Sequence, residues 1–179
     1  MSLWSRLTMG CICSRDNVHI GDRLFYIRQR LGDGGFSVVD LIEESRSHKV
    51  YALKRIPCHS REDEQVAERE VEYMLSVQHP NLVPCDGHML MSLTSTGPAL
   101  NRSAISEMLI IMPYYWKGSL QNEIEALHRK EQLMTERRVL RVFRAVCEGL
   151  KALHTLLPTA LAHRYVYQSE ITRMKYYAV

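Results

Sequence analysis

The 179-residue sequence has no apolar run approaching the roughly 20 residues that a membrane-spanning helix requires. No signal peptide opens the chain. It also lacks the Lys/Arg-rich block of a nucleic-acid-binding arm, and a net charge of +3 is too small to indicate a polyanionic partner. Apolar residues make up 46% and charged residues 24%, so we expect one domain with a packed core.

The cysteines are irregularly spaced. The five cysteines are an odd number, which does not suit a disulfide framework. Cys11 and Cys13 have no second cysteine pair or nearby histidine set that would complete a zinc site. We therefore expect a reducing, cytosol-facing environment and no bound metal.

Hydrophobic periodicity predicts strands, then a helix, then a strand, then two helices. Alternating or β-branched apolar segments indicate the strands, and apolar residues three or four apart indicate the helices. The expected strands are 24–31, 36–42, 50–56 and 108–112; the expected helices are 62–77, a segment after Gly118-Ser119, and 135–154; and 90–101 is expected to be a loop.

A glycine-rich turn separates the first two predicted strands, within Leu31-Gly32-Asp33-Gly34-Gly35-Phe36-Ser37-Val38-Val39. Such a turn can lay backbone N–H groups over a polyphosphate, because glycine permits sharp bending and close approach. A dinucleotide-binding fold would have a helix after the glycines, and a Walker loop would end in Gly-Lys-Ser/Thr, but neither occurs here. A glycine-rich hairpin without a ligand is the alternative.

Two charged residues stand where burial is expected. Lys54 follows Ala52 and Leu53 in a predicted strand, and Glu70 falls on the packing face of the first predicted helix. Burying an unpaired charge is costly, so each residue needs a partner unless its head group reaches water. An ion pair between Lys54 and Glu70 is the simpler interpretation.

Together these features resemble the protein kinase family. The glycine turn, the Ala-x-Lys strand, the helix glutamate and His79-Pro80-Asn81 occur in family order and spacing, and the resemblance runs from about Leu24 to Arg164. It implies an α+β fold: a kinase-like N-terminal lobe with a five-stranded antiparallel sheet and one helix, followed by an incomplete helical C-terminal lobe. It also implies ATP as the ligand and protein Ser/Thr side chains as acceptors.

The same resemblance assigns roles within an ATP site. Lys54 would hold the α- and β-phosphates, and Glu70 would orient Lys54. Leu31, Val39 and Ala52 would clamp the adenine. With the gatekeeper Met112 and the hinge that follows it, the implied ATP-binding set is Leu31, Gly32, Gly34, Gly35, Phe36, Ser37, Val39, Ala52, Lys54, Glu70, Met112, Tyr114 and Tyr115.

One departure from the general family pattern and two further segments narrow the group. Ser37 replaces the third glycine of the turn, as in the Numb-associated kinase group. Within that group, Met112-Pro113-Tyr114-Tyr115 and Met9-Gly10-Cys11-Ile12-Cys13-Ser14 resemble the myristoylated and palmitoylated serine/threonine kinase branch. The branch implies a cytoplasmic protein attached to Golgi or perinuclear membranes.

The second of these segments matches the acylation pattern Met-Gly-x-x-x-Ser/Thr. Gly10 would take a myristoyl chain, and Cys11 and Cys13 would take palmitoyl chains, which together give stable membrane attachment. Myristoylation requires glycine at a free N-terminus, so this interpretation makes Met9 the start and residues 1–8 a translated leader. An unmodified leader is the alternative.

The family's catalytic loop is incomplete. His163 and Arg164 occupy the expected places, but Tyr165 stands at the catalytic Asp position, Tyr167 at the Lys and Glu170 at the Asn. Neither Asp-Phe-Gly nor Ala-Pro-Glu follows, so both magnesium-binding side chains of the family are missing, and Mg²⁺ is expected only in the full-length kinase. Since a general base alone contributes about 10²–10⁴-fold, we expect no measurable phosphotransfer.

The predicted organisation is a leader with the acylation motif over 1–22, an N-terminal lobe and hinge over 23–115, the start of a C-terminal lobe over 116–164, and a tail unlike a kinase over 165–179. The expected function is the ATP-binding portion of a serine/threonine kinase, truncated before the catalytic Asp. The alternative is a non-catalytic nucleotide- or partner-binding module that regulates the full-length kinase. Expected partners are protein substrates of the full-length form and membranes, with no nucleic acid.

Overall fold

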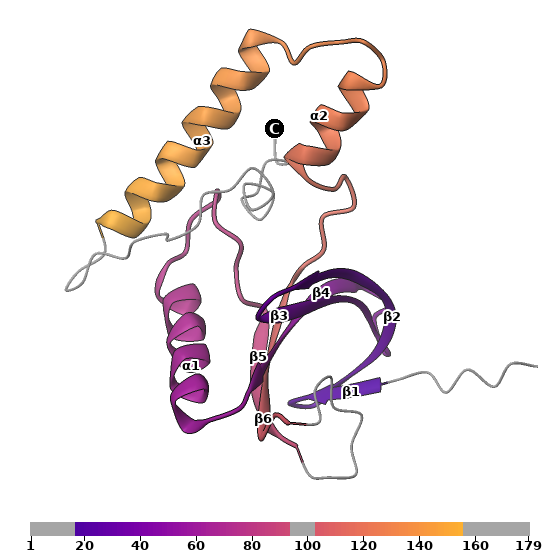
Figure 1. Cartoon of the computed structure of the whole chain (residues 1–179), viewed down its shortest axis with the longest axis vertical. Coiled ribbons are helices and arrows are strands. Elements are labelled where there is room, and N and C mark those ends of the chain that lie inside the picture. Colours follow the sequence, from indigo (N-terminus) through magenta and orange to yellow (C-terminus); the bar gives the residue numbers. More distant parts are fainter. Residues whose placement is uncertain (1–16, 94–102, 156–179) are drawn as a thin grey trace, which may run out of the picture.

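Six antiparallel strands form one strongly curved sheet, with a helix on its outer face and a pair of helices beyond it (Figure 1). The computed structural model describes residues 17–93 and 103–155. In spatial order the strands are β1 (Asn17–Ile20), β2 (Arg23–Gly34), β3 (Ser37–Glu44), β4 (Val50–Cys58), β6 (Ser106–Pro113) and β5 (Gly87–Ser92), and the helices are α1 (Arg61–Ser76), α2 (Leu120–His128) and α3 (Glu136–His154).

Every strand and helix expected from periodicity is present, and two further strands join them. The loop expected from residue 90 was wrong for Leu90 to Ser92, which belong to β5. This strand lies at the sheet edge and contains no β-branched residue, so its sequence does not indicate a strand. Its pairing with β6 determines the extended conformation. The strand β1 falls within the predicted leader 1–22 and pairs with β2 through a turn at Gly21, whose φ is +58°.

The sheet packs on both faces. Inside its curve lies an apolar cluster formed by Ile20, Phe25, Ile42, Leu53, Leu109 and Ile111. The outer face packs against α1 through a second cluster that contains Cys58, Ala67, Val71, Met108, Ile110 and Met112. Two register shifts in β2 interrupt its ladder with β3, and such bulges increase the bend of a strand.

The N-terminus of α1 is fixed by a capping box. Ser60 Oγ accepts a hydrogen bond from the Asp63 backbone N–H at 3.2 Å, and the Asp63 carboxylate accepts one from the Ser60 N–H at 3.1 Å. Acidic residues fill the first turn, where the helix dipole favours negative charge. This cap sets where α1 begins and therefore which of its residues face the sheet.

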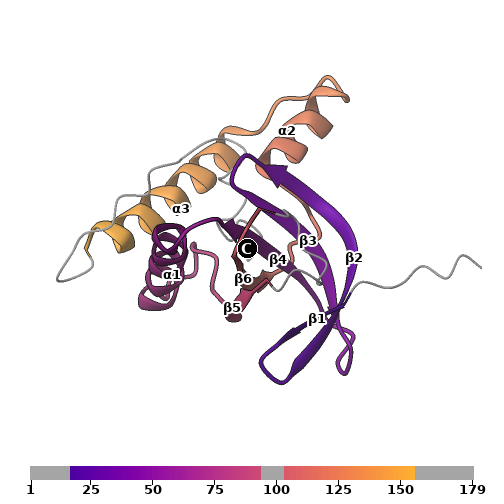
Figure 2. The ribbon, with the colours of Figure 1, turned by 60° about the horizontal axis from the view of Figure 1, so that its bottom comes forward.

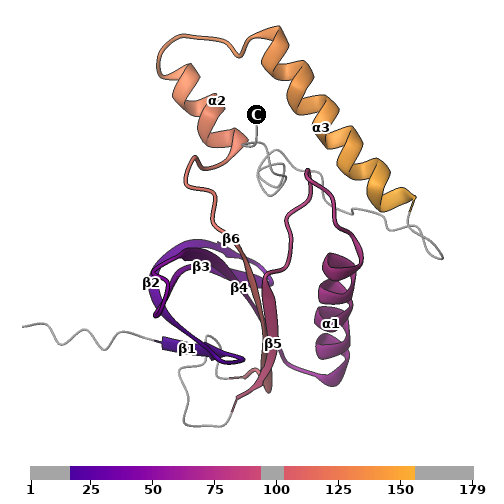
Figure 3. The same ribbon diagram turned by 180° about the vertical axis from the view of Figure 1, so that it is seen from behind.

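The segment after α1 joins the sheet to the helical pair. Asn81 donates a hydrogen bond from Nδ2 to Glu148 Oε2 of α3 at 3.0 Å. A Cβ on Gly149 would lie 3.4 Å from the Asn81 carbonyl oxygen, at ordinary van der Waals contact, so the segment passes directly over α3. Leu82 then packs against Val142 and Val146, and α2 and α3 lie on the side of the sheet away from β1 (Figure 2 and Figure 3).

The two helices of the pair are held by a small core and a bidentate ion pair. Arg138 donates from Nε and Nη2 to the two Glu123 oxygens at 2.9 and 2.7 Å. These hydrogen bonds lower the pKa of Glu123 below its ordinary value. The apolar stripe of α3 is only partly covered, because Phe143 is 66% exposed. Among the described residues, no helix is long and apolar enough to cross a membrane.

Candidate functional site

The strand register places the predicted phosphate and adenine residues on one face of the sheet. Val39 pairs with Gly32 on one side and Lys54 on the other, and Ala52 pairs with Met112. Directly opposed residues share a face, as do residues two apart on one strand. These five residues therefore lie on the face that α1 covers.

The predicted ion pair between Lys54 and Glu70 is confirmed. Lys54 Nζ donates to Glu70 Oε1 at 2.6 Å, and the Lys54 side chain is only 12% exposed. Glu70 reaches it because Ala67 and Val71 of α1 are buried on the sheet and turn the intervening helix face toward β4. The carboxylate thus holds a half-buried ammonium group beside the strands that carry the glycine turn.

The glycine turn is a tight hairpin between β2 and β3. Gly34 pairs with Ser37, which leaves Gly35 and Phe36 at the tip, where Phe36 is 90% exposed. The chain reverses sharply here although none of Gly32, Gly34 and Gly35 has a positive φ. A Cβ at Gly32 or Gly35 would meet no atom within 4 Å, so what glycine provides here is open space above the backbone.

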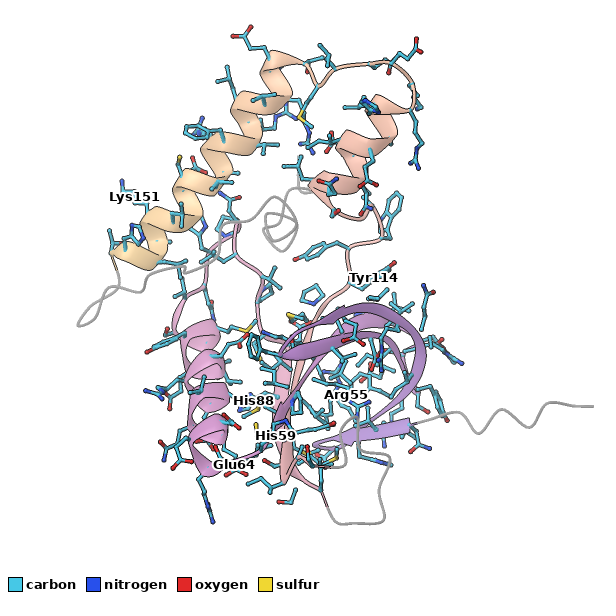
Figure 4. The ribbon with its side chains drawn as sticks, viewed as in Figure 1. Arg55, His59, Glu64, His88, Tyr114 and Lys151 are labelled. Atoms are coloured by element: carbon cyan, nitrogen blue, oxygen red, sulfur yellow. The ribbon has the colours of Figure 1, made fainter. Side chains whose placement is uncertain are left out.

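The predicted hinge links β6 to α2. Met112 is 5% exposed near the end of β6, and Tyr114 lies on the linking segment between the sheet and the helical pair (Figure 4). The Tyr115 hydroxyl is buried without a hydrogen-bond partner among the described residues. Burial, and secondarily the negative charge of Asp86, raises the pKa of Tyr115 above its ordinary value. The Tyr115 carbonyl accepts a hydrogen bond from the Gly118 N–H at 3.1 Å, which bends the chain toward α2.

This arrangement suits a polyphosphate ligand. A lysine held by a carboxylate lies on the same face as an open glycine turn, so a cation and uncovered backbone share one side of the sheet. Apolar side chains at Val39, Ala52 and Met112 line the route from the turn to the hinge.

Comparison with known proteins decides the family. A model of the protein kinase domain matches residues 25–166, well over half of the chain. The chain belongs to the protein kinase family. The expected α+β fold of a kinase N-terminal lobe and a partial helical lobe is confirmed, with six strands in the sheet where five were expected.

Curated relatives within the family are serine/threonine kinases. Serine/threonine-protein kinase 16 of Homo sapiens is 36% identical over 154 residues, covering 86% of this chain and 47% of that protein. The Rattus norvegicus protein of the same name has the same identity and coverage. Serine/threonine-protein kinase ENV7 of Saccharomyces cerevisiae is 27% identical over 157 residues, covering 80% of this chain and 41% of that protein. The chain thus spans about half the length of the curated kinases it matches.

Several predicted residues lie outside the described part of the chain. These are the acylation residues Gly10, Cys11 and Cys13, and the catalytic-loop segment 163–170. At the position where the family has its magnesium-binding Asn, this sequence has Glu170. The described residues contain no set of three His, Cys, Asp or Glu side chains placed to hold a metal ion.

Sequence reasoning missed a group of charges inside the curve of the sheet. Asp40, Arg55 and Glu107 are all at most 8% exposed, and Figure 4 shows Arg55 within the sheet. The available signal was that each of these charges stands two residues from apolar positions of the same strand. Which charge pairs with which depends on the register that aligns β3, β4 and β6, and the sequence does not give that register.

Proposed function

We propose that this chain is the ATP-binding portion of a serine/threonine protein kinase. The observation that carries the proposal is the Lys54–Glu70 pair at 2.6 Å on the same face as the glycine turn. A lysine held in this way can contact the phosphates of a nucleotide, while Val39, Ala52 and Met112 offer apolar contacts to a base. The names of the related kinases support serine/threonine rather than tyrosine as the acceptor in the full-length protein.

Titration of the purified chain with a fluorescent ATP analogue tests the proposal, followed by displacement with unlabelled ATP. We expect saturable binding that ATP reverses and a rise in the thermal unfolding temperature with ATP. Folded protein that shows neither would contradict nucleotide binding.

We further propose that this chain binds nucleotide without transferring its phosphate. Tyr165 at the catalytic Asp position cannot act as the base that receives a substrate hydroxyl proton at neutral pH. Glu170 also replaces the magnesium-binding Asn of the family, which changes the ligands offered to the metal that neutralises the phosphate charge. In a radiolabelled γ-phosphate transfer assay with generic protein acceptors, incorporation should equal that of a Lys54→Ala control. Incorporation clearly above this control would contradict the proposal.

For the full-length kinase, we propose protein Ser/Thr substrates and membrane attachment at Gly10, Cys11 and Cys13, on Golgi or perinuclear membranes. The support is the match of residues 9–14 to the acylation pattern, with two neighbouring cysteines to strengthen a single weak myristoyl anchor. Metabolic labelling of expressing cells with alkyne myristate should mark the protein, and Gly10→Ala should abolish the label. Native protein whose sole N-terminal peptide spans Thr8 to Gly10 would contradict the proposal.

A further inference from the structure

A continuous chain of ionic contacts crosses four strands at the glycine-turn end of the sheet. We call it the charge chain; in order, its members are Asp33, Arg30, Asp40, Arg55 and Glu107. Arg30 Nη1 lies 3.3 Å from Asp33 Oδ2, and Arg30 Nε lies 3.0 Å from Asp40 Oδ1. Arg55 Nη1 lies 3.7 Å from Asp40 Oδ2, and Arg55 Nη2 lies 2.7 Å from Glu107 Oε2.

Two buried carboxylates of the charge chain contact the same guanidinium. Asp40 and Glu107 are 2% and 0% exposed, and both form ion pairs with Arg55. Asp40 Oδ2 has no hydrogen-bond partner in the described structure, so the strong hydrogen bond to this side chain comes from Arg30 Nε to Oδ1. That bond also raises the pKa of Arg30. Arg30 therefore adds a second positive charge beside the buried Asp40 carboxylate.

Arg30 is placed where it can control the turn. It pairs with Asp40 immediately before the register shift of β2, and Gly32 resumes the ladder opposite Val39. Asp33 lies near the end of β2, just before the turn, and pairs with buried Val38, which puts its side chain on the face opposite Lys54. Arg30 holds that carboxylate there, away from the face on which phosphates would lie.

We propose that Arg30 is a positioning residue that anchors the glycine turn to the buried Asp40 and so sets the affinity of the chain for nucleotide. The anchoring stands on the contacts alone, and its effect on affinity rests on the proposed ATP-binding function. The two parts have separate readouts.

The chain offers a matched control. Arg28 of β2 donates to Glu43 of β3, with Nη2 at 2.8 Å from Oε2, but this pair lies further from the turn and has no buried acid behind it. Arg28→Gln therefore removes a cross-strand ion pair between the same two strands without touching the charge chain. Comparing Arg30→Gln with Arg28→Gln isolates the anchoring.

Hydrogen exchange of the full chain without nucleotide is the first measurement. In Arg30→Gln, peptides covering residues 31–39 should exchange about tenfold faster or more, because a charge-assisted hydrogen bond that closes the turn is lost. Arg28→Gln should leave these peptides unchanged. Arg30→Lys should restore part of the protection, since an ammonium group replaces the charge but not the fork of donors. Asp33→Asn, at an exposed site that does not threaten folding, should speed exchange to a smaller extent.

The second measurement is the dissociation constant of a fluorescent ATP analogue. Arg30→Gln should raise it about tenfold, and Arg28→Gln should leave it within about twofold. Equal exchange of residues 31–39 in the two glutamine variants would overturn the anchoring, whatever the nucleotide result. Faster exchange in Arg30→Gln with unchanged nucleotide affinity would overturn the link to the site. A wild-type chain that binds no nucleotide would refute the proposed function and with it the affinity link, while exchange would still decide the anchoring.

Discussion

Lys54→Met is expected to weaken ATP binding strongly while leaving the sheet folded. The Lys54 ammonium is held on the nucleotide face by Glu70, and its side chain is 12% exposed. Removing it takes away the charge available to the phosphates, which should weaken binding by about 10²-fold, because hydrogen bonds between ionised groups are the strong ones. Titration with the fluorescent ATP analogue measures the loss.

Two companion variants give this prediction its controls. Lys49→Met removes an exposed lysine before β4 and should leave the affinity unchanged. Glu70→Gln keeps the shape of the partner but not its charge, so it should weaken binding less than Lys54→Met does. Wild-type affinity in Lys54→Met would place the nucleotide elsewhere on the molecule.

Arg55→Met should have the largest effect on stability. It leaves Glu107, which is fully buried, without its partner at 2.7 Å, and leaves Asp40 with Arg30 alone. Removing one partner of a buried pair typically costs about 3–5 kcal/mol, a large part of the 5–15 kcal/mol that stabilises an ordinary domain. Urea denaturation followed by circular dichroism should show a much lower midpoint.

The matched control for this prediction is Arg28→Met, which removes a partly exposed arginine of the same sheet. Its pair with Glu43 should contribute no more than about 1 kcal/mol. The double variant Arg55→Met/Glu107→Leu should be less destabilised than Arg55→Met, because the buried carboxylate left without its partner is then gone. A double variant as unstable as the sum of its parts would show that Arg55 acts through packing and not through charge.

Apolar periodicity was sufficient to predict the helices, because α3 repeats its buried residues at helical spacing and begins at an N-cap threonine. It was not sufficient for β1 and β5. The four residues of β1 are too few to establish a period, although Val18 and Ile20 alternate ahead of the turn at Gly21. In β5 the unbranched apolar side chains gave no strand signal, and pairing with β6 determines its conformation.

Charge was informative where two neighbouring elements each carried one unpaired group. Lys54 and Glu70 are 16 positions apart and belong to consecutive elements, so their pairing could be predicted. Arg55 and Glu107 are 52 positions apart, and only the ladder between β4 and β6 brings them together. The glycine turn between two strands was predicted from the sequence, and the structure adds that a side chain at Gly32 or Gly35 would meet no atom within 4 Å.

The strand order has a consequence for how the chain folds. Strands β1 to β4 pair as successive hairpins, so each can form once its neighbour has been synthesised. Closing β4 onto β6 instead brings together segments separated by α1 and β5, and loop-closure entropy makes such long-range pairing slow. Refolding measured by stopped flow should therefore slow when the ladder between β4 and β6 is weakened and change little when that between β1 and β2 is. Before β6 pairs with β4, Arg55 remains hydrated and β4 is an unpaired edge of the sheet. Another chain can then pair with β4 in place of β6.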